Sequence, residues 1–165
     1  LKSHNQTEFL EQALKYLKDN KINIDFSLAK PIPCGCPSMQ MSSKNALNQW
    51  PIQLALLNPF APFFENTDLL ISADCVAHTF ANFHNRFLKD KTLIIFCPKL
   101  DINLDVYIQK LTEIFKNNTI KSITILRMEV PCCGGVLRIT EEALKQSGKN
   151  ILIKEYTISL QGEIT

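Results

Sequence analysis

Short apolar runs alternate with amphipathic segments from residue 68 onward, and this alternation restricts the fold more than any other feature of the chain. Four runs are rich in β-branched residues and bounded by turn residues, which predicts buried strands over 68–74, 92–97, 122–128 and 151–159. Apolar residues at helical spacing predict helices over 77–88, 104–117 and 136–147. Strands joined by helices of this length form right-handed crossovers. We therefore predict an α/β fold, a single-domain sandwich with a mostly parallel central sheet and helices on both faces.

Residues 1–40 do not follow this pattern. An amphipathic helix is predicted over 7–19, and a loop rich in Pro and Ser follows it and contains Cys34 and Cys36. We expect this amino-terminal segment to wrap around the core of an α/β domain that covers 41–165. A further strand is predicted over 52–57, because Pro59 and Pro62 end the apolar run there. The chain begins with Leu, which is typical of a fragment.

The composition is that of an ordinary folded protein. Of 165 residues, 45% are apolar and 21% charged, which is enough to bury one core. The net charge of +2 gives no electrostatic signature of a nucleic-acid or anionic membrane partner. No stretch approaches the roughly twenty apolar residues of a membrane span, and no signal peptide is recognisable. We expect a cytoplasmic protein without nucleic-acid or membrane partners.

Most of the cysteines directly follow predicted strands. Cys75, Cys97 and the pair Cys132–Cys133 each come shortly after one. The carboxyl ends of parallel strands face one crevice, so these thiols are expected to converge there. Soft thiolates select zinc, iron–sulfur clusters or copper(I), and a tetrahedral site needs four donors. The candidate metal ligands are Cys36, Cys75, Cys97 and Cys132, with Cys133 as the alternative to Cys132.

Simpler interpretations of these thiols stay open. Free cysteine is often a small buried apolar residue, so Cys75 and Cys97 can also be core residues at strand ends. Disulfides are disfavoured, because a bond between the adjacent Cys132 and Cys133 is strained and disulfide frameworks belong to small domains with little core. We therefore expect reduced thiols in a cytosolic or anaerobic compartment.

The run 130–135, with sequence VPCCGG, precedes a predicted helix. Unpaired N–H groups and the helix dipole lower the pKa of a thiol at such a position. Cys133 is therefore the candidate catalytic thiol, beside Cys132. Gly134 and Gly135 are candidate cofactor-binding residues, because glycine lets the backbone approach a ligand or cluster closely. A plain tight turn is the alternative.

Acidic residues also follow the predicted strands. Asp74, Asp101 and Glu129 stand where acid–base groups or partners of a metal ligand would be placed. Each can instead be a turn or cap carboxylate. Asp101 with Asn103 is well placed to cap the helix over 104–117, and for Asp101 we prefer the cap.

The motifs taken together suggest a family. The chain resembles, from about Cys36 to its QGEI ending, the carboxyl-terminal cysteine-bearing region of 4Fe–4S ferredoxin-domain proteins of anaerobes, in CGCPSMQM, QWPIQLALLNPFAPFF, DLLISADCVAHTFANFH, LIIFCPKLD and ITILRMEVPCCGG. The resemblance implies an iron–sulfur redox protein in which Cys36, Cys75, Cys97 and Cys132–Cys133 match the family's cysteine motifs. The usual ferredoxin run CxxCxxCxxxCP is absent from this chain. The implied partner is thus a ferredoxin-type domain, either upstream or on a separate protein.

Three functions follow from these observations. The leading hypothesis is an iron–sulfur or metal-binding redox module that takes part in electron transfer, with a 4Fe–4S cluster as cofactor, as part of an oxidoreductase. The first alternative is a zinc-binding domain or zinc enzyme, with Zn²⁺ held by Cys75, Cys97, His78 and Cys132. The second alternative is a metal-free reactive thiol that exchanges disulfides or carries persulfide.

Overall fold

The computed structural model describes residues 46–165 together with Gln12, Lys15, Tyr16 and Asp19. By its internal contacts the chain divides into two units, Leu1–Ser42 and Ser43–Thr165. In the first unit, the four described residues are helical and exposed, and they fall within the helix predicted over 7–19. The predicted loop with Cys34 and Cys36 lies outside the described residues. Every element with described bounds belongs to the second unit.

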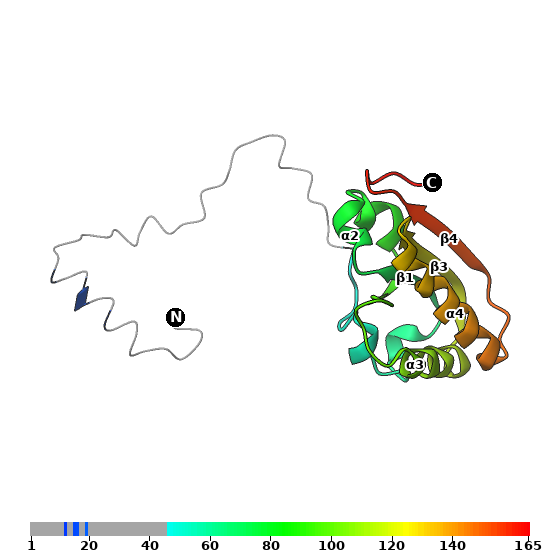
Figure 1. Ribbon diagram of the computed structural model, residues 1–165. Helices are drawn as coiled ribbons and strands as arrows, with labels where there is room; N and C mark the ends of the chain where they lie inside the picture. Colours follow the sequence, from blue (N-terminus) through cyan, green and yellow to red (C-terminus); the bar gives the residue numbers. More distant parts are fainter. Residues whose placement is uncertain (1–11, 13–14, 17–18, 20–45) are drawn as a thin grey trace. The chain divides into compact units, whose positions relative to one another are not determined.

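The core of the second unit is a sheet of four parallel strands (Figure 1). The strands are β1 (Thr67–Ala73), β2 (Thr92–Phe96), β3 (Ile120–Met128) and β4 (Ile153–Ile158), in the order β2-β1-β3-β4. In the register, Ile71 of β1 lies between Ile94 of β2 and Ile125 of β3, and all three are fully buried. Such runs of buried residues are typical of parallel strands covered on both faces. The predicted α/β class is confirmed.

Helices cover both faces of this sheet, as predicted. The chain steps from β2 to β3 and from β3 to β4 in the same direction, so right-handed crossovers place α3 (Leu104–Asn117) and α4 (Gly134–Ser147) on one face. The step from β1 to β2 runs the other way, which places α2 (Val76–Thr79) and the π-helical segment η6 (His84–Leu88) on the opposite face. There the ring of Phe87 lies 5.2 Å from the ring of Tyr156 in β4.

Two predicted elements differ from the structure. The helix predicted over 77–88 is broken into α2 and η6, because Phe80 adopts extended backbone angles between them. Thr79 and Asn82 have low helix propensity, while the buried Phe83 and Phe87 hold the segment on the sheet. Helical periodicity here reports packing rather than one continuous helix.

The strand predicted over 52–57 is also wrong. The 3₁₀ segment η4 (Leu54–Leu56) occupies this region, and of these residues only Gln53 forms a β-bridge, to Ile95. A second 3₁₀ segment, η5 (Pro62–Phe64), follows it. Lys110 Nζ donates hydrogen bonds to the carbonyl oxygens of Leu54 at 3.1 Å and Ala55 at 2.8 Å. These carbonyls are therefore paired with a lysine side chain instead of a sheet.

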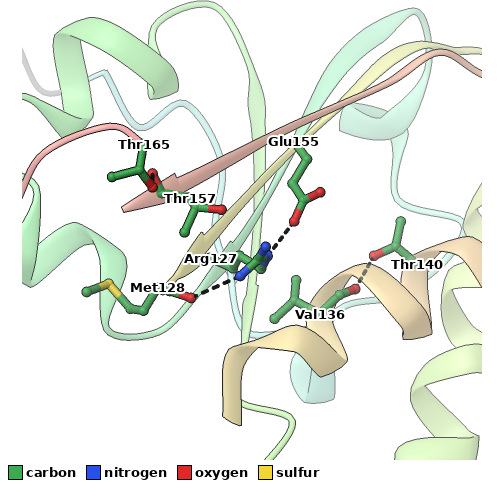
Figure 2. A network of polar contacts seen from close by, with 7 residues as sticks. All are labelled: Arg127, Met128, Val136, Thr140, Glu155, Thr157 and Thr165. Carbon is green, nitrogen blue, oxygen red and sulfur yellow. Dashed lines mark hydrogen bonds and ion pairs between the residues drawn. The ribbon is translucent and has the colours of Figure 1, made fainter. Parts of the chain in front are cut away.

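The residues after β4 fold back along it. Gly162 turns the chain with a φ of 80°, Ile164 pairs antiparallel with Ile158, and the Thr165 N–H donates to the Thr157 carbonyl at 3.0 Å. Figure 2 shows Thr165 beside Thr157. Residues 159–165 are called the tail below. In the part of the chain that the structure describes, no helix has the length and apolar character needed to cross a bilayer.

Candidate functional site

The strand order defines where a ligand site is expected. β2 lies on one side of β1, and β3 and β4 lie on the other, so the loops that leave β1 and β3 turn to opposite sides. In parallel sheets, ligands bind in the crevice at such a switch point, beyond the carboxyl ends of the strands. The residues after Ala73 of β1 and after Met128 of β3 therefore border the candidate site.

Three thiols stand at this switch point. Cys75 lies in the turn between β1 and α2, and Cys132 and Cys133 belong to the 3₁₀ segment η7 (Pro131–Cys133) that leads into α4. Cys97 follows β2, the strand next to β1. All four are free thiols: Cys75 and Cys132 are exposed, Cys97 is half-buried and Cys133 is buried. The predicted placement of these cysteines after strands is confirmed.

The pKa of the buried Cys133 thiol is shifted by its surroundings. Burial raises the pKa of the Cys133 thiol, the negative charges of Cys132 and Cys75 raise it further, and a backbone hydrogen bond with Met128 acts in the opposite direction. The sequence had predicted a lowered pKa at this helix start. That expectation does not hold for Cys133, because the loss of solvent around its sulfur outweighs the helix-terminal effect.

The turn that carries Cys97 packs closely against the start of α4. A Cβ atom at Gly135 would lie 2.6 Å from Pro98 Cβ, so the start of α4 rests directly on the residue after Cys97. At Gly134 the nearest such neighbour is the Arg138 guanidinium, at 3.8 Å. Gly135 thus lets α4 approach the β2 turn, while the space beside Gly134 is filled only by the end of a long side chain.

Two carboxylates stand near the thiols. Asp101 is held by the turn after β2, and Asp74 is held by Gln53. The Cys97 N–H donates to Asp101 Oδ2 at 2.9 Å, and the Asp101 N–H donates to the Cys97 carbonyl at 3.0 Å. Asp101 therefore closes the turn after β2. The prediction that it caps α3 is wrong, because Asn103 occupies that position with a φ of 65° and without a side-chain cap.

Asp74 is the carboxylate nearest Cys75 in the chain. Burial raises the pKa of Asp74, the hydrogen bond from Gln53 opposes this, and the charge of Asp101 adds to it. Gln53 Nε2 lies 3.4 Å from each Asp74 carboxylate oxygen. Burial and the neighbouring Asp101 raise the pKa of Tyr107 to about 12. Neither Gln53 nor Tyr107 was predicted as a site residue, because no local pattern in the sequence marks either one as a neighbour of Asp74 or Asp101.

The tail connects the two loops of the switch point. Glu129 Oε1 accepts a hydrogen bond from the Leu160 N–H at 2.8 Å, and a Cβ at Gly162 would lie 2.6 Å from the carbonyl oxygen of Thr79. Glu129, a candidate acid in the sequence, is therefore a partner of the tail backbone. Arg127 forms an ion pair with Glu155 and donates to the Met128 carbonyl (Figure 2).

The described cysteines do not form a closed ligand set. Among residues 46–165 and the four described residues before them, no group of three or more His, Cys, Asp or Glu side chains is arranged to hold a metal ion. His78, the nitrogen donor considered for zinc, is exposed on α2. Cys36, the fourth predicted thiolate, lies outside the described residues.

This crevice also differs from a dinucleotide site. The turn after β1 has the sequence DCV and contains no glycine, and the sequence nowhere contains G-x-G. Dinucleotide-binding turns need these glycines to let the pyrophosphate approach a helix start. The turns at this switch point carry cysteines where a dinucleotide-binding protein has a glycine-rich phosphate-binding turn.

The comparisons with known proteins agree with this fold. The Rossmann-like domain family matches residues 61–165, and the chain belongs to this family. A protein of Archaeoglobus fulgidus described as uncharacterized is 29% identical over 118 residues, which cover 72% of this chain and 82% of that protein. No solved structure matches the chain. The assignment to 4Fe–4S ferredoxin-domain proteins is therefore wrong, because the matching family is the Rossmann-like domain and no ferredoxin or iron–sulfur family is found.

Proposed function

We propose that this Rossmann-like domain is a redox module that holds an iron–sulfur cluster or another thiophilic metal through the cysteines of its switch point. The observation that carries the proposal is the gathering of Cys75, Cys132 and Cys133 at one crevice, with Cys97 on the neighbouring turn. Thiolates are the donors that iron–sulfur clusters, zinc and copper(I) prefer.

The electrostatics of the crevice support a cationic occupant. Burial is the main cause of the raised pKa of the Cys133 thiol, and each thiolate that forms beside it raises that pKa further. A bound metal centre removes this penalty, because it stabilises several thiolates at once and releases their protons. Cys75 and Cys132 are exposed, so a metal can reach both from solvent. Cys97 and Cys36 are the other two predicted ligands.

The chain itself would supply the surroundings of such a centre. A 4Fe–4S cluster, when bound, accepts or donates a single electron and so can pass it between partner proteins. The Met128 backbone hydrogen bond to Cys133 favours thiolate over thiol at that sulfur. The tail, bound to Glu129 and packed against Thr79, lies beside the two loops that carry the thiols.

Metal and sulfide analysis of the anaerobically purified chain tests the proposal. We expect a brown protein with iron and inorganic sulfide in near-equal amounts. Cys75→Ser and Cys132→Ser should each lose most of the iron, because a hydroxyl is a poor ligand for soft metals. Cys34→Ser, outside the proposed ligand set, is the matched control and should keep the wild-type content.

The same samples separate the alternatives. Zinc found without sulfide would show that the site binds zinc and not a cluster. The zinc content of the Cys75→Ser variant would then show whether the same thiols hold the zinc. A colourless protein that takes up neither cluster nor zinc under reducing, anaerobic conditions would refute metal binding.

A metal-free thiol protein is the second candidate. It is favoured by the absence, in the described part of the chain, of a group of three donors arranged for a metal, and by the exposure of Cys75 and Cys132. The Cys132 thiolate would attack a disulfide of a partner protein and displace one partner thiolate. Cys75 would then attack the mixed disulfide and release the second thiolate, so that two thiols of this chain are oxidised while the partner disulfide is reduced. Trapping of a mixed disulfide by the Cys75→Ser variant, and not by Cys132→Ser, is the expected result.

A further inference from the structure

A cavity lies at the opposite end of the sheet from the thiols. It has a volume of about 360 Å³ and opens on the face that carries η6. Asp68 and Ser122, near the amino ends of β1 and β3, form one wall, and they are paired in the register. Lys154, near the start of β4, stands on the other. The cavity is therefore separate from the switch point at the carboxyl ends.

Cationic side chains dominate this cavity. Arg86 of η6, Lys91 and Lys154 line it, against the single carboxylate of Asp68. The only ion pair within the described residues is Arg127–Glu155, so none of the three cations has an acidic partner there. Like charges gathered around a cavity repel one another, and an anion bound among them relieves that repulsion.

Hydroxyl groups supply further donors. Thr124 lies in the cavity wall, and its hydroxyl makes no hydrogen bond with any residue the structure describes. Among the described residues, Gln49 Oε1 is the only buried side-chain polar atom that lacks a hydrogen-bond partner. The unpaired Thr124 hydroxyl is therefore not fully buried. The Thr124 hydroxyl is thus open to the cavity. Phe87 and Tyr156, whose rings are 5.2 Å apart, give the cavity an apolar floor.

Asp68 gives the site a preference for ligands that carry hydroxyl groups. The Ser122 hydroxyl donates to Asp68 Oδ1 at 2.5 Å, which fixes the carboxylate at the wall. The other carboxylate oxygen accepts no hydrogen bond from the described residues. A carboxylate held in this way repels a bare anion but accepts hydrogen bonds from hydroxyl groups of a ligand.

We propose that this cavity binds a phosphate monoester of a small hydroxylated molecule. The Arg86 guanidinium matches two phosphate oxygens, while Lys91 and Lys154 act as point charges on the same group. The cavity volume exceeds that of a phosphate group alone, and the space near Asp68 and the two rings takes the hydroxylated remainder. The site shares no residue with the thiol site and does not depend on the function proposed for it.

Titration calorimetry on the full chain, at about 0.15 M salt to screen weak surface attraction, tests this site. The probe is ribose 5-phosphate, with ribose and malate as comparisons. We expect ribose 5-phosphate to bind with a Kd below about 1 mM, while ribose gives no heat and malate binds at least about tenfold more weakly. Comparable binding of malate would overturn the phosphate assignment, and absence of ribose 5-phosphate binding would overturn the site.

Matched double variants separate the cavity from general surface charge. Arg86→Ala with Lys154→Ala should weaken ribose 5-phosphate binding more than about tenfold, because charge-assisted hydrogen bonds are lost. Lys116→Ala with Lys145→Ala removes the same charge from exposed positions outside the cavity and should leave the Kd within about twofold. Equal weakening by both pairs would reduce the binding to non-specific attraction and refute the proposal.

Asp68 provides a test of opposite sign. Asp68→Asn should strengthen the binding of inorganic phosphate, because the repelling carboxylate is gone. The advantage of ribose 5-phosphate over inorganic phosphate should shrink, since the amide is a weaker acceptor for ligand hydroxyls. An unchanged ratio of the two affinities would contradict the assigned role of Asp68.

Discussion

Two adjacent glycines at the start of α4 have different surroundings, although the sequence treats them alike. Gly135 rests on Pro98, and Gly134 faces only a flexible side chain. Both glycines are predicted from the sequence to bind a cofactor, whereas the close approach that the structure shows at Gly135 is to Pro98. A sequence cannot reveal such a contact, because Pro98 becomes a neighbour of Gly135 only when the β2 turn and α4 come together.

We expect Gly135→Ala to lower the free energy of unfolding by about 1–3 kcal/mol, the usual cost of overpacking. The added methyl group would lie 2.6 Å from Pro98 Cβ, and the proline ring cannot swing away as a long side chain can. Gly134→Ala is the matched control and should be neutral or stabilising by up to about 1 kcal/mol, because alanine is the better helix former. Urea unfolding of the two variants measures the difference. Equal stability would show that α4 does not rest on the β2 turn.

At the scale of elements, regular segments were predictable and connections were not. The helix over 104–117 agrees with α3 to the residue, because one face of it is apolar throughout and packs on the sheet. The prediction of one helix over 77–88 is wrong. The aromatic residues that pack on the sheet recur there at helical spacing, although the segment has low helix propensity. The strand predicted over 52–57 is wrong because the backbone there closes the 3₁₀ turn of η4, and Lys110 binds the carbonyls of Leu54 and Ala55.

The tail is the element whose attachment can be tested directly. Gly162→Ala introduces strain at a φ of 80° and places a methyl group 2.6 Å from the Thr79 carbonyl oxygen. We expect the tail to detach, so that hydrogen exchange at the Leu160 and Thr165 amides accelerates at least about tenfold. Gly148→Ala also has a positive φ, of 69°, but nothing lies within 4 Å of its Cβ position. Gly148→Ala should leave the Leu160 and Thr165 amides protected from exchange. Faster exchange in both variants would contradict the contact between Gly162 and Thr79.

At the scale of the whole molecule, the order of the strands decides which cysteines meet. The sequence predicted that thiols follow the strands, and that part of the candidate site is confirmed. It contained no signal for the order β2-β1-β3-β4, which brings the turn after β1 next to η7 across the switch point. The same order separates the thiols from the cationic cavity, and the two lie at opposite ends of the sheet.

The backfolded tail also bears on how the protein behaves at high concentration. β4 is an outermost strand, and unpaired N–H and C=O groups of such strands recruit strands of other molecules into aggregates. The pairing of Ile164 and Thr165 with β4 occupies these groups near its carboxyl end, as the bridge from Gln53 does on β2. Deletion of residues 161–165 should therefore increase light scattering on mild heating. Thr165→Ala keeps the backbone pairing and should scatter light like the wild type. That result would show that the main chain of the tail, and not a side chain, prevents aggregation.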